Sequence, residues 1–130
     1  MDPVVVLIEP NPLHAKLFSE FIQMSGHRCV TAPSGQEGFA ITAAERPKLV
    51  ILDIVLPDCD GRDLILDMRR DTRTADIAIM VLTAVDDLTV ESECRAFGAE
   101  AFLGKPLHLS VLLDSIDSLV GPAVVRRTAQ

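Results

Sequence analysis

A chain of 130 residues can form one compact domain but not two, and its 48% hydrophobic content can build a core without disulfides. The net charge of −7 argues against nucleic-acid binding through phosphate neutralisation, and the 4% aromatic content argues against sites built on ring stacking. No apolar run approaches the roughly 18 residues that span a membrane, and no signal peptide is visible. We therefore expect a cytoplasmic protein with neither a nucleic-acid nor a membrane partner.

Short apolar runs alternate with helical patterns from one end of the chain to the other. A continuous run of β-branched and aliphatic residues predicts a strand over residues 4–8 that is buried on both faces. A helix follows, and its spacing predicts a core-facing stripe of apolar side chains. That stripe is predicted to hold Leu13, Leu17 and Phe21, widened by Phe18 and Ile22.

The later elements continue the alternation and carry local start and stop signals. Ser34 and Glu37 form a capping box at the start of the second helix, and Asp87 is predicted to cap the fourth. The remaining predicted strands cover residues 28–32, 49–52, 77–82 and 101–103, and the predicted helices cover residues 13–25, 35–45, 62–70, 88–97 and 109–120.

Five strands with helices between them give a (βα)5 pattern. Because crossovers between parallel strands are right-handed, this pattern predicts a doubly wound α/β fold with a five-stranded parallel sheet and helices on both faces. We expect one domain over residues 1–121 and a frayed tail over residues 122–130. Three widely spaced cysteines without a C-x-x-C pair fit neither a zinc site nor a disulfide framework, so we expect free thiols.

Polar residues follow four of the predicted strands. Glu9 follows the first, Asp53 the third and Lys105 the fifth, while Thr83 follows the fourth. Ligands bind at the carboxyl ends of strands in an open parallel sheet, so we expect these four side chains to converge. A carboxylate can attack phosphorus to form an acyl phosphate, and a second carboxylate can help to hold a divalent cation. A hydroxyl and an ammonium can then bind the phosphoryl oxygens.

Three fragments in this order give the chain a strong resemblance to the response regulator receiver domain, over about residues 4–120. The fragments are Leu-Asp-Ile-Val-Leu-Pro-Asp-Cys-Asp-Gly (52–61), Leu-Thr-Ala (82–84) and Phe-Leu-Gly-Lys-Pro (102–106). The resemblance implies a flavodoxin-like, CheY-like fold and a stand-alone switch in two-component signalling. It also implies that a histidine kinase or phosphotransferase donates the phosphoryl group and that an effector protein receives the output. The same resemblance implies that the chain is not an enzyme.

The resemblance also implies a role for each matching residue. Asp53 corresponds to the phospho-acceptor and Lys105 to the phosphate-binding lysine, joined to Pro106 by a cis peptide bond. Thr83 corresponds to the switch hydroxyl and Phe102 to the switch aromatic, although an aromatic there is as readily core filler. The implied Mg²⁺ ligands are Glu9, Asp53 and the backbone carbonyl of Val55, and the implied partner contacts are Leu13, His14 and Pro106.

Two departures from the family pattern alter these expectations. Receivers usually carry two adjacent acids after the first strand, but here Pro10 takes the second position and has no side-chain ligand. We therefore expect weak Mg²⁺ binding and slower phosphorylation. Val55 and Val85, two residues after Asp53 and Thr83, are apolar where polar side chains orient an attacking water. We expect any acyl phosphate to persist.

Three other functions are alternatives to the phosphoryl switch. Pro10 supports a pseudo-receiver, which is a phosphorylation-independent binding module with impaired Mg²⁺ binding. An FMN carrier of similar fold needs a hydroxyl-rich phosphate loop after the first strand, which the segment 9–12 does not supply. A dehalogenase-type phosphatase needs a second Asp two residues after the nucleophile, where this chain has Val55.

Overall fold

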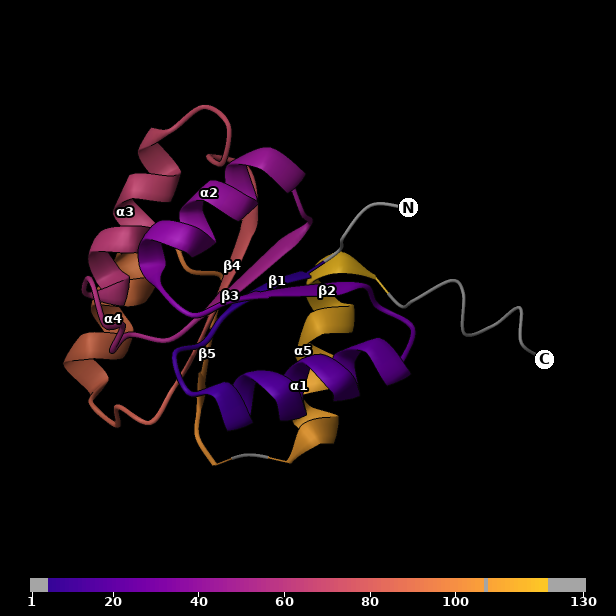
Figure 1. Ribbon diagram of the computed structural model, residues 1–130. Helices are drawn as coiled ribbons and strands as arrows, with labels where there is room; N and C mark the ends of the chain where they lie inside the picture. The colour runs from indigo at the N-terminus through magenta and orange to yellow at the C-terminus, as the bar shows by residue number, and fades with distance from the viewer. Residues whose placement is uncertain (1–4, 107, 122–130) are drawn as a thin grey trace.

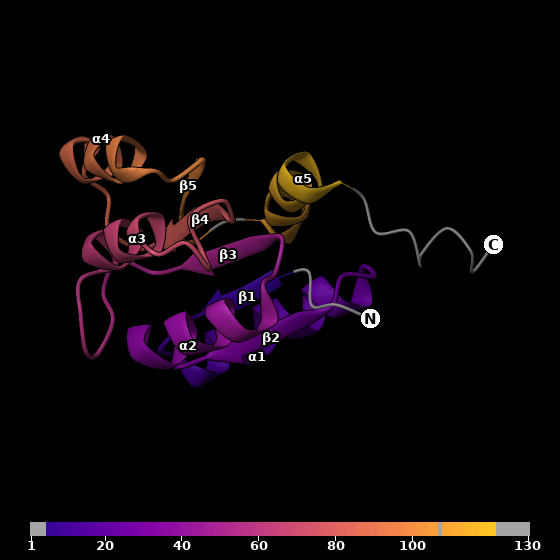
Figure 2. The same cartoon turned by 90° about the horizontal axis from the view of Figure 1, so that it is seen from above.

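The computed structural model describes residues 5–106 and 108–121, so Val4 and the predicted tail 122–130 lie outside the described residues. Five parallel strands form one sheet in the order β2-β1-β3-β4-β5, which Figure 2 shows from one edge of the sheet to the other. The strands are β1 (Val5–Ile8), β2 (Cys29–Ala32), β3 (Leu49–Leu52), β4 (Ala78–Thr83) and β5 (Ala101–Gly104). The helices are α1 (Pro12–Met24), α2 (Gly35–Glu45), α3 (Gly61–Arg70), α4 (Leu88–Phe97) and α5 (Leu109–Val120). The predicted doubly wound (βα)5 fold is confirmed.

Helices cover both faces of the sheet, with α1 and α5 on one face and α2, α3 and α4 on the other (Figure 1). Successive strand residues point to opposite faces, so each strand contributes to two cores. In β1, Val5 and Leu7 pack with α1 and α5, while Val6 and Ile8 pack with the other three helices. This double burial explains why the central strands are continuous apolar runs rather than alternating ones.

The predicted core face of α1 is wrong in part. Phe18 and Ile22 are buried, but Leu13 and Leu17 are 76% and 52% exposed. The helix carries apolar residues on two adjoining stripes, so periodicity does not decide which stripe faces the sheet. Packing against the sheet and α5 selects the stripe of Phe18 and Ile22 and leaves Leu13 and Leu17 on the outer surface.

The sheet order places the carboxyl ends of β1 and β3 side by side at the centre of the sheet. Ile8 pairs with Leu52, and the N–H of Asp53 donates to the carbonyl of Ile8. Glu9 and Asp53 therefore leave neighbouring strands at the same level. On the other side of β3, Thr83 ends β4 and pairs with Gly104, the residue before Lys105. The predicted convergence of the four strand ends is confirmed.

Candidate functional site

Asp53 lies at the centre of the site, with both carboxylate oxygens engaged. Its Oδ1 atom accepts a hydrogen bond from the Thr83 hydroxyl at 2.7 Å and one from the Val55 N–H at 3.3 Å. Its Oδ2 atom accepts from the Lys105 ammonium at 3.1 Å. The residue is only 9% exposed, so little water competes for these contacts. The arrangement brings a carboxylate, a hydroxyl donor and a cation to one point.

Lys105 occupies a position between two carboxylates. Its Nζ atom lies 2.5 Å from Oε1 of Glu9 and 3.1 Å from Oδ2 of Asp53, and 3.4 Å from Nδ1 of His14. An ammonium has three N–H donors, and three acceptor atoms surround this one. The Lys105 ammonium also lies over the face of the Phe18 ring, 6.0 Å from the ring centroid. The predicted cis peptide bond between Lys105 and Pro106 is confirmed.

Glu9 is 3% exposed and has a partner for each oxygen. Its Oε2 atom accepts from the backbone N–H of Asn11 at 3.0 Å, while Oε1 accepts from Lys105. Asn11 does not replace the missing second acid, because its side-chain oxygen caps α1 by accepting from the N–H groups of Leu13 and His14.

The oxygen atoms at this site are of the type that binds Mg²⁺, but few of them belong to carboxylates. Glu9 and Asp53 supply carboxylate oxygens, the ligands that Mg²⁺ prefers, and Val55 can supply a backbone carbonyl. Among the described residues, however, no group of three or more His, Cys, Asp or Glu side chains is placed to hold a metal ion. Both carboxylates are also paired with Lys105. A metal ion bound here has to share them with that ammonium.

Thr83 and Phe102 border the same hollow beside Asp53. Thr83 is fully buried, and its hydroxyl oxygen accepts from the N–H of Val85 at 3.3 Å while it donates to Asp53. Phe102 is half-buried and packs against the core under α2, α3 and α4. Both residues line a cavity of about 350 Å³ together with Lys105. Phe102 is thus both a core residue and a neighbour of the proposed switch hydroxyl.

The segment after Asp53 forms a loop whose two sides are joined by backbone contacts. The sequence pattern predicted a loop here but not these contacts. Val55 and Asp60 form an antiparallel bridge, and the N–H of Gly61 donates to the carbonyl of Ile54 at 2.7 Å. A Cβ atom at Gly61 would lie 2.5 Å from the backbone oxygen of Asp53, so the close approach requires glycine. The Asp-Gly pair at 60–61 is the local signal for this turn.

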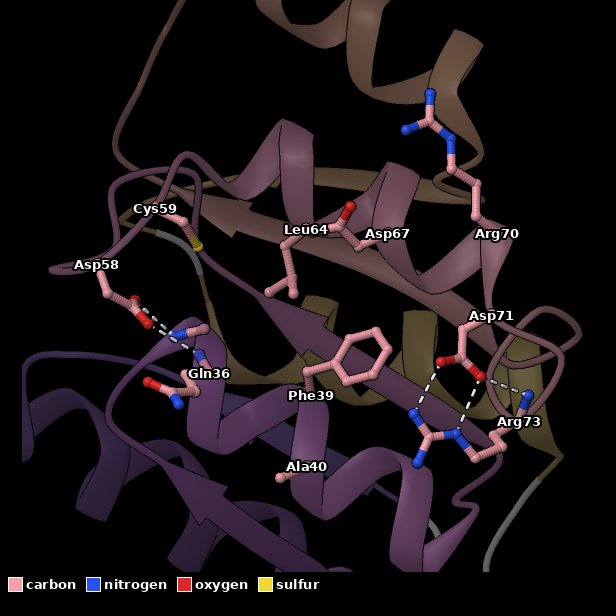
Figure 3. Close-up of a pocket in the computed structure, with 11 residues that line it drawn as sticks. Gln36, Phe39, Ala40, Asp58, Cys59, Leu64, Asp67, Arg70, Asp71 and Arg73 are labelled. Atoms are coloured by element: carbon pink, nitrogen blue, oxygen red, sulfur yellow. Dashed lines mark hydrogen bonds and ion pairs between the residues drawn. The ribbon is translucent and has the colours of Figure 1, made fainter.

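Asp58 fastens this loop to α2. Its two carboxylate oxygens accept from the N–H groups of Gly35 and Gln36, each at 2.9 Å (Figure 3). These hydrogen bonds, that of Gln36 first, hold the pKa of the Asp58 carboxyl below its ordinary value. The pairing joins residues that are far apart in the chain, so sequence reasoning missed it.

A hollow of about 730 Å³ lies between α2 and α3, and none of the predicted site residues lines it. Figure 3 shows Phe39 and Leu64 in this hollow and an ion pair between Asp71 and Arg73 at its edge. Arg73 also lies 5.8 Å from the centroid of the Phe39 ring. The side-chain hydrogen bond from Arg73 lowers the pKa of the Asp71 carboxyl to about 2.

The residues predicted as partner contacts are all on the surface. Leu13 is 76% exposed, and His14 and Pro106 are also exposed. The three cysteines are free thiols, as expected, and burial raises the pKa of Cys29 to about 12. No helix in the described part of the chain is long and apolar enough to cross a membrane.

Comparison with known proteins shows which family the sequence matches. The family model for the response regulator receiver domain matches residues 5–117. The polar-differentiation response regulators DivK of Brucella anthropi and Brucella ovis are each 29% identical to the chain over 123 residues, which cover 95% of this chain and 100% of theirs.

Solved structures agree in fold. The chemotaxis protein CheY4 of Vibrio cholerae has a TM-score of 0.85 at 23% identity, covering 92% of this chain and 99% of that one. The receiver domain of a Pseudomonas aeruginosa sensor histidine kinase, with a magnesium ion coordinated in its active-site cleft, has a TM-score of 0.84 at 21% identity, covering 93% and 99%.

Proposed function

Because the chain belongs to the response regulator receiver domain family, we propose that it is a phosphoryl-accepting signalling switch in which Asp53 is the acceptor. One observation carries the proposal: the Asp53 carboxylate is held on one oxygen by the Thr83 hydroxyl and on the other by the Lys105 ammonium. These are the donors that a transferred phosphoryl group needs once it is bonded to an oxygen of the carboxylate.

The proposed phosphodonor is a phosphohistidine on a histidine kinase or phosphotransferase. An Asp53 oxygen attacks phosphorus, and a P–O bond forms as the P–N bond breaks. The departing imidazole nitrogen keeps the bonding pair and takes a proton from water. Lys105 and Thr83 bind the oxygens of the transferred group, and the Thr83 hydroxyl thereby changes its partner from Asp53 to the phosphoryl group. The protein itself carries the product, so we propose a switch rather than an enzyme.

Magnesium, when bound, neutralises charge on the phosphoryl oxygens. The residues proposed to hold it are Asp53, Glu9 and the backbone carbonyl of Val55. Pro10 supplies no ligand, and Glu9 already binds Lys105 and the N–H of Asn11. We therefore propose a weaker affinity for Mg²⁺ than a receiver with two adjacent acids has.

The proposed partner surface combines α1 with the segment after β5. Leu13 and Leu17 expose apolar surface on α1, and His14 and Pro106 lie beside the site entrance. Exposed apolar side chains grouped beside a reactive centre favour docking of the phosphodonor protein there. An effector protein then takes the output. Three free cysteines fit action in the reducing cytoplasm.

A second candidate function is a phosphorylation-independent binding module of the same fold. The observation that favours it is the position of the Lys105 ammonium between Glu9 and Asp53, which balances both carboxylates without a metal ion. In that case Asp53 serves the structure as one end of a buried ion pair.

Incubation with acetyl phosphate across a Mg²⁺ titration, read by intact mass, distinguishes the two functions. We expect a gain of one phosphoryl group that disappears in Asp53→Asn. The matched control is Asp63→Asn, which removes an exposed acid on α3 and should leave the gain intact. No gain at any Mg²⁺ concentration, or an equal gain in Asp53→Asn, rules out the switch and favours the binding module.

A further inference from the structure

The loop that follows Asp53 closes on itself through backbone contacts. The Val55–Asp60 bridge joins its two sides, and the Gly61 N–H donates to Ile54, the residue after Asp53. Gly61 lies against the Asp53 backbone so closely that no side chain fits between them. A displacement at the start of this loop is therefore carried to its end, where α3 begins.

Arg62 links the end of the loop to α4. Its backbone N–H donates to Oδ1 of Asp60 at 2.8 Å, and its Nε and one terminal nitrogen donate to the two oxygens of the same carboxylate at 3.0 and 2.6 Å. The other terminal nitrogen donates to Oε1 of Glu93 at 2.8 Å. Glu93 belongs to α4, 31 residues further along the chain. One guanidinium thus binds the loop and a separate helix.

The fork of contacts to Asp60 makes this link stiffer than an ordinary surface ion pair. A guanidinium held by a two-point contact keeps its planar orientation, so reaching Glu93 costs little additional side-chain freedom. The bond to Arg62 also holds the pKa of Asp60 below its ordinary value, so the carboxylate stays charged. A second ion pair, between Glu91 and Arg95, joins two residues of α4 and so does not link the helix to another element.

Asp53 also reaches α4 by a second route. The Thr83 hydroxyl donates to Asp53 and accepts from Val85, which lies in the segment leading into α4. The helix is therefore connected to Asp53 at its start through Thr83 and along its length through Arg62 and Glu93. Two chains of hydrogen bonds thus run from the Asp53 region towards α4, one through Thr83 and Val85 and the other through Arg62 and Glu93.

We propose that Arg62 is a positioning residue that couples the Asp53 loop to α4, through Asp60 on one side and Glu93 on the other. Changes in the loop alter the placement of α4, and by reciprocity changes at Glu93 alter the order of the loop. The coupling within the unmodified protein stands on its own contacts. Its use in signalling rests on the proposed function, because phosphorylation of Asp53 is the event that α4 then reports.

The first test uses the unmodified protein and needs no phosphorylation. Hydrogen exchange of the Val55 and Gly61 amides is compared between wild type, Glu93→Gln and the matched control Glu91→Gln. Glu93→Gln should speed both amides by about two- to fivefold, the range expected from one partly exposed ion pair. Glu91→Gln should leave them unchanged, and the amides of α1 in the same samples report any global opening. Unchanged loop amides in Glu93→Gln, or an equal effect in Glu91→Gln, overturn the coupling.

The second test asks whether phosphorylation changes α4. The protein is treated with acetyl phosphate and Mg²⁺, and the gain of a phosphoryl group is measured by intact mass. In phosphorylated wild type the exchange of the α4 amides should differ from that of the unmodified chain, and the difference should shrink in Glu93→Gln but not in Glu91→Gln. Equal differences in both variants overturn the proposed use of Arg62. If no phosphoryl group is gained, the proposed function fails while the first test still decides the coupling.

Discussion

The ammonium of Lys105 lies closer to Glu9 than to Asp53, at 2.5 Å from one carboxylate and 3.1 Å from the other. The lysine and glutamate side chains are only 11% and 3% exposed, so solvent screens this pair little. Next to Glu9, Pro10 adds no negative charge. The protein's own cation thus balances the carboxylates that a magnesium ion also has to use, and we expect the competition between lysine and metal to set how easily Asp53 is phosphorylated.

Restoring the second acid should shift that competition toward the metal. We expect Pro10→Asp to lower the Mg²⁺ concentration needed for half-maximal phosphorylation by acetyl phosphate by about tenfold, because a further carboxylate strengthens an all-oxygen site. The measurement is the intact-mass titration. Pro10→Asn is the control, since it also removes the proline ring but adds no charge. The expectation is contradicted if the two variants titrate alike.

The side chain of Val55 should control the lifetime of the acyl phosphate. Val55 is 65% exposed beside Asp53, so a polar residue fits there at little cost in stability. We expect Val55→Asn to speed hydrolysis by about tenfold by orienting a water for attack. The phosphorylated fraction is followed with time by mass after removal of the donor.

Val55→Ala is the matched control, because it shortens the side chain without adding a polar group. A hydrolysis rate in Val55→Asn equal to that of wild type would show that water orientation at this position does not limit the reaction.

Gly61 should tolerate no side chain. A Cβ atom there would lie 2.5 Å from the Asp53 carbonyl oxygen and 2.7 Å from the Ile54 Cα, and neither backbone atom can move without opening the loop. We expect Gly61→Ala to lower the free energy of unfolding by about 2–3 kcal/mol in urea denaturation, as overpacking does. Gly104→Ala is the control, since its Cβ meets nothing closer than 4.0 Å. Similar losses in the two variants would contradict the argument.

The cap formed by Asp58 should make stability depend on pH in acid. Hydrogen bonds from the Gln36 and Gly35 N–H groups hold the pKa of the Asp58 carboxyl below its ordinary 3.8. The folded pKa is thus lower than the unfolded one. The stabilisation is present in full above the unfolded pKa and is lost as pH falls through the folded pKa.

We therefore expect the free energy of unfolding of wild type to fall more steeply than that of Asp58→Asn between about pH 5 and pH 3. Urea denaturation at several pH values measures the difference. Asp76→Asn, which removes an exposed acid before β4, should keep the wild-type slope. Parallel curves for wild type and Asp58→Asn would show that the capping bonds do not persist in solution.

The secondary structure could be predicted almost completely because its signals are local. Caps at Ser34 and Asp87 and the apolar periodicity place each element within a residue or two, as at β4, predicted over 77–82 and found over Ala78–Thr83. The four strand-end residues of the site were also predictable. Parallel strands bring their carboxyl ends to one edge, so residues that follow four strands have to meet.

The sequence by itself determined the order of the elements, the parallel sheet and the set of groups around Asp53. Tertiary structure alone decided which stripe of α1 is buried, that Lys105 pairs with Glu9, and that Arg62 reaches Glu93. The reason is physical. Helix and strand formation depend on neighbours a few residues apart, whereas these pairings join residues far apart in the chain that meet only after the sheet has set the distances between its helices and loops.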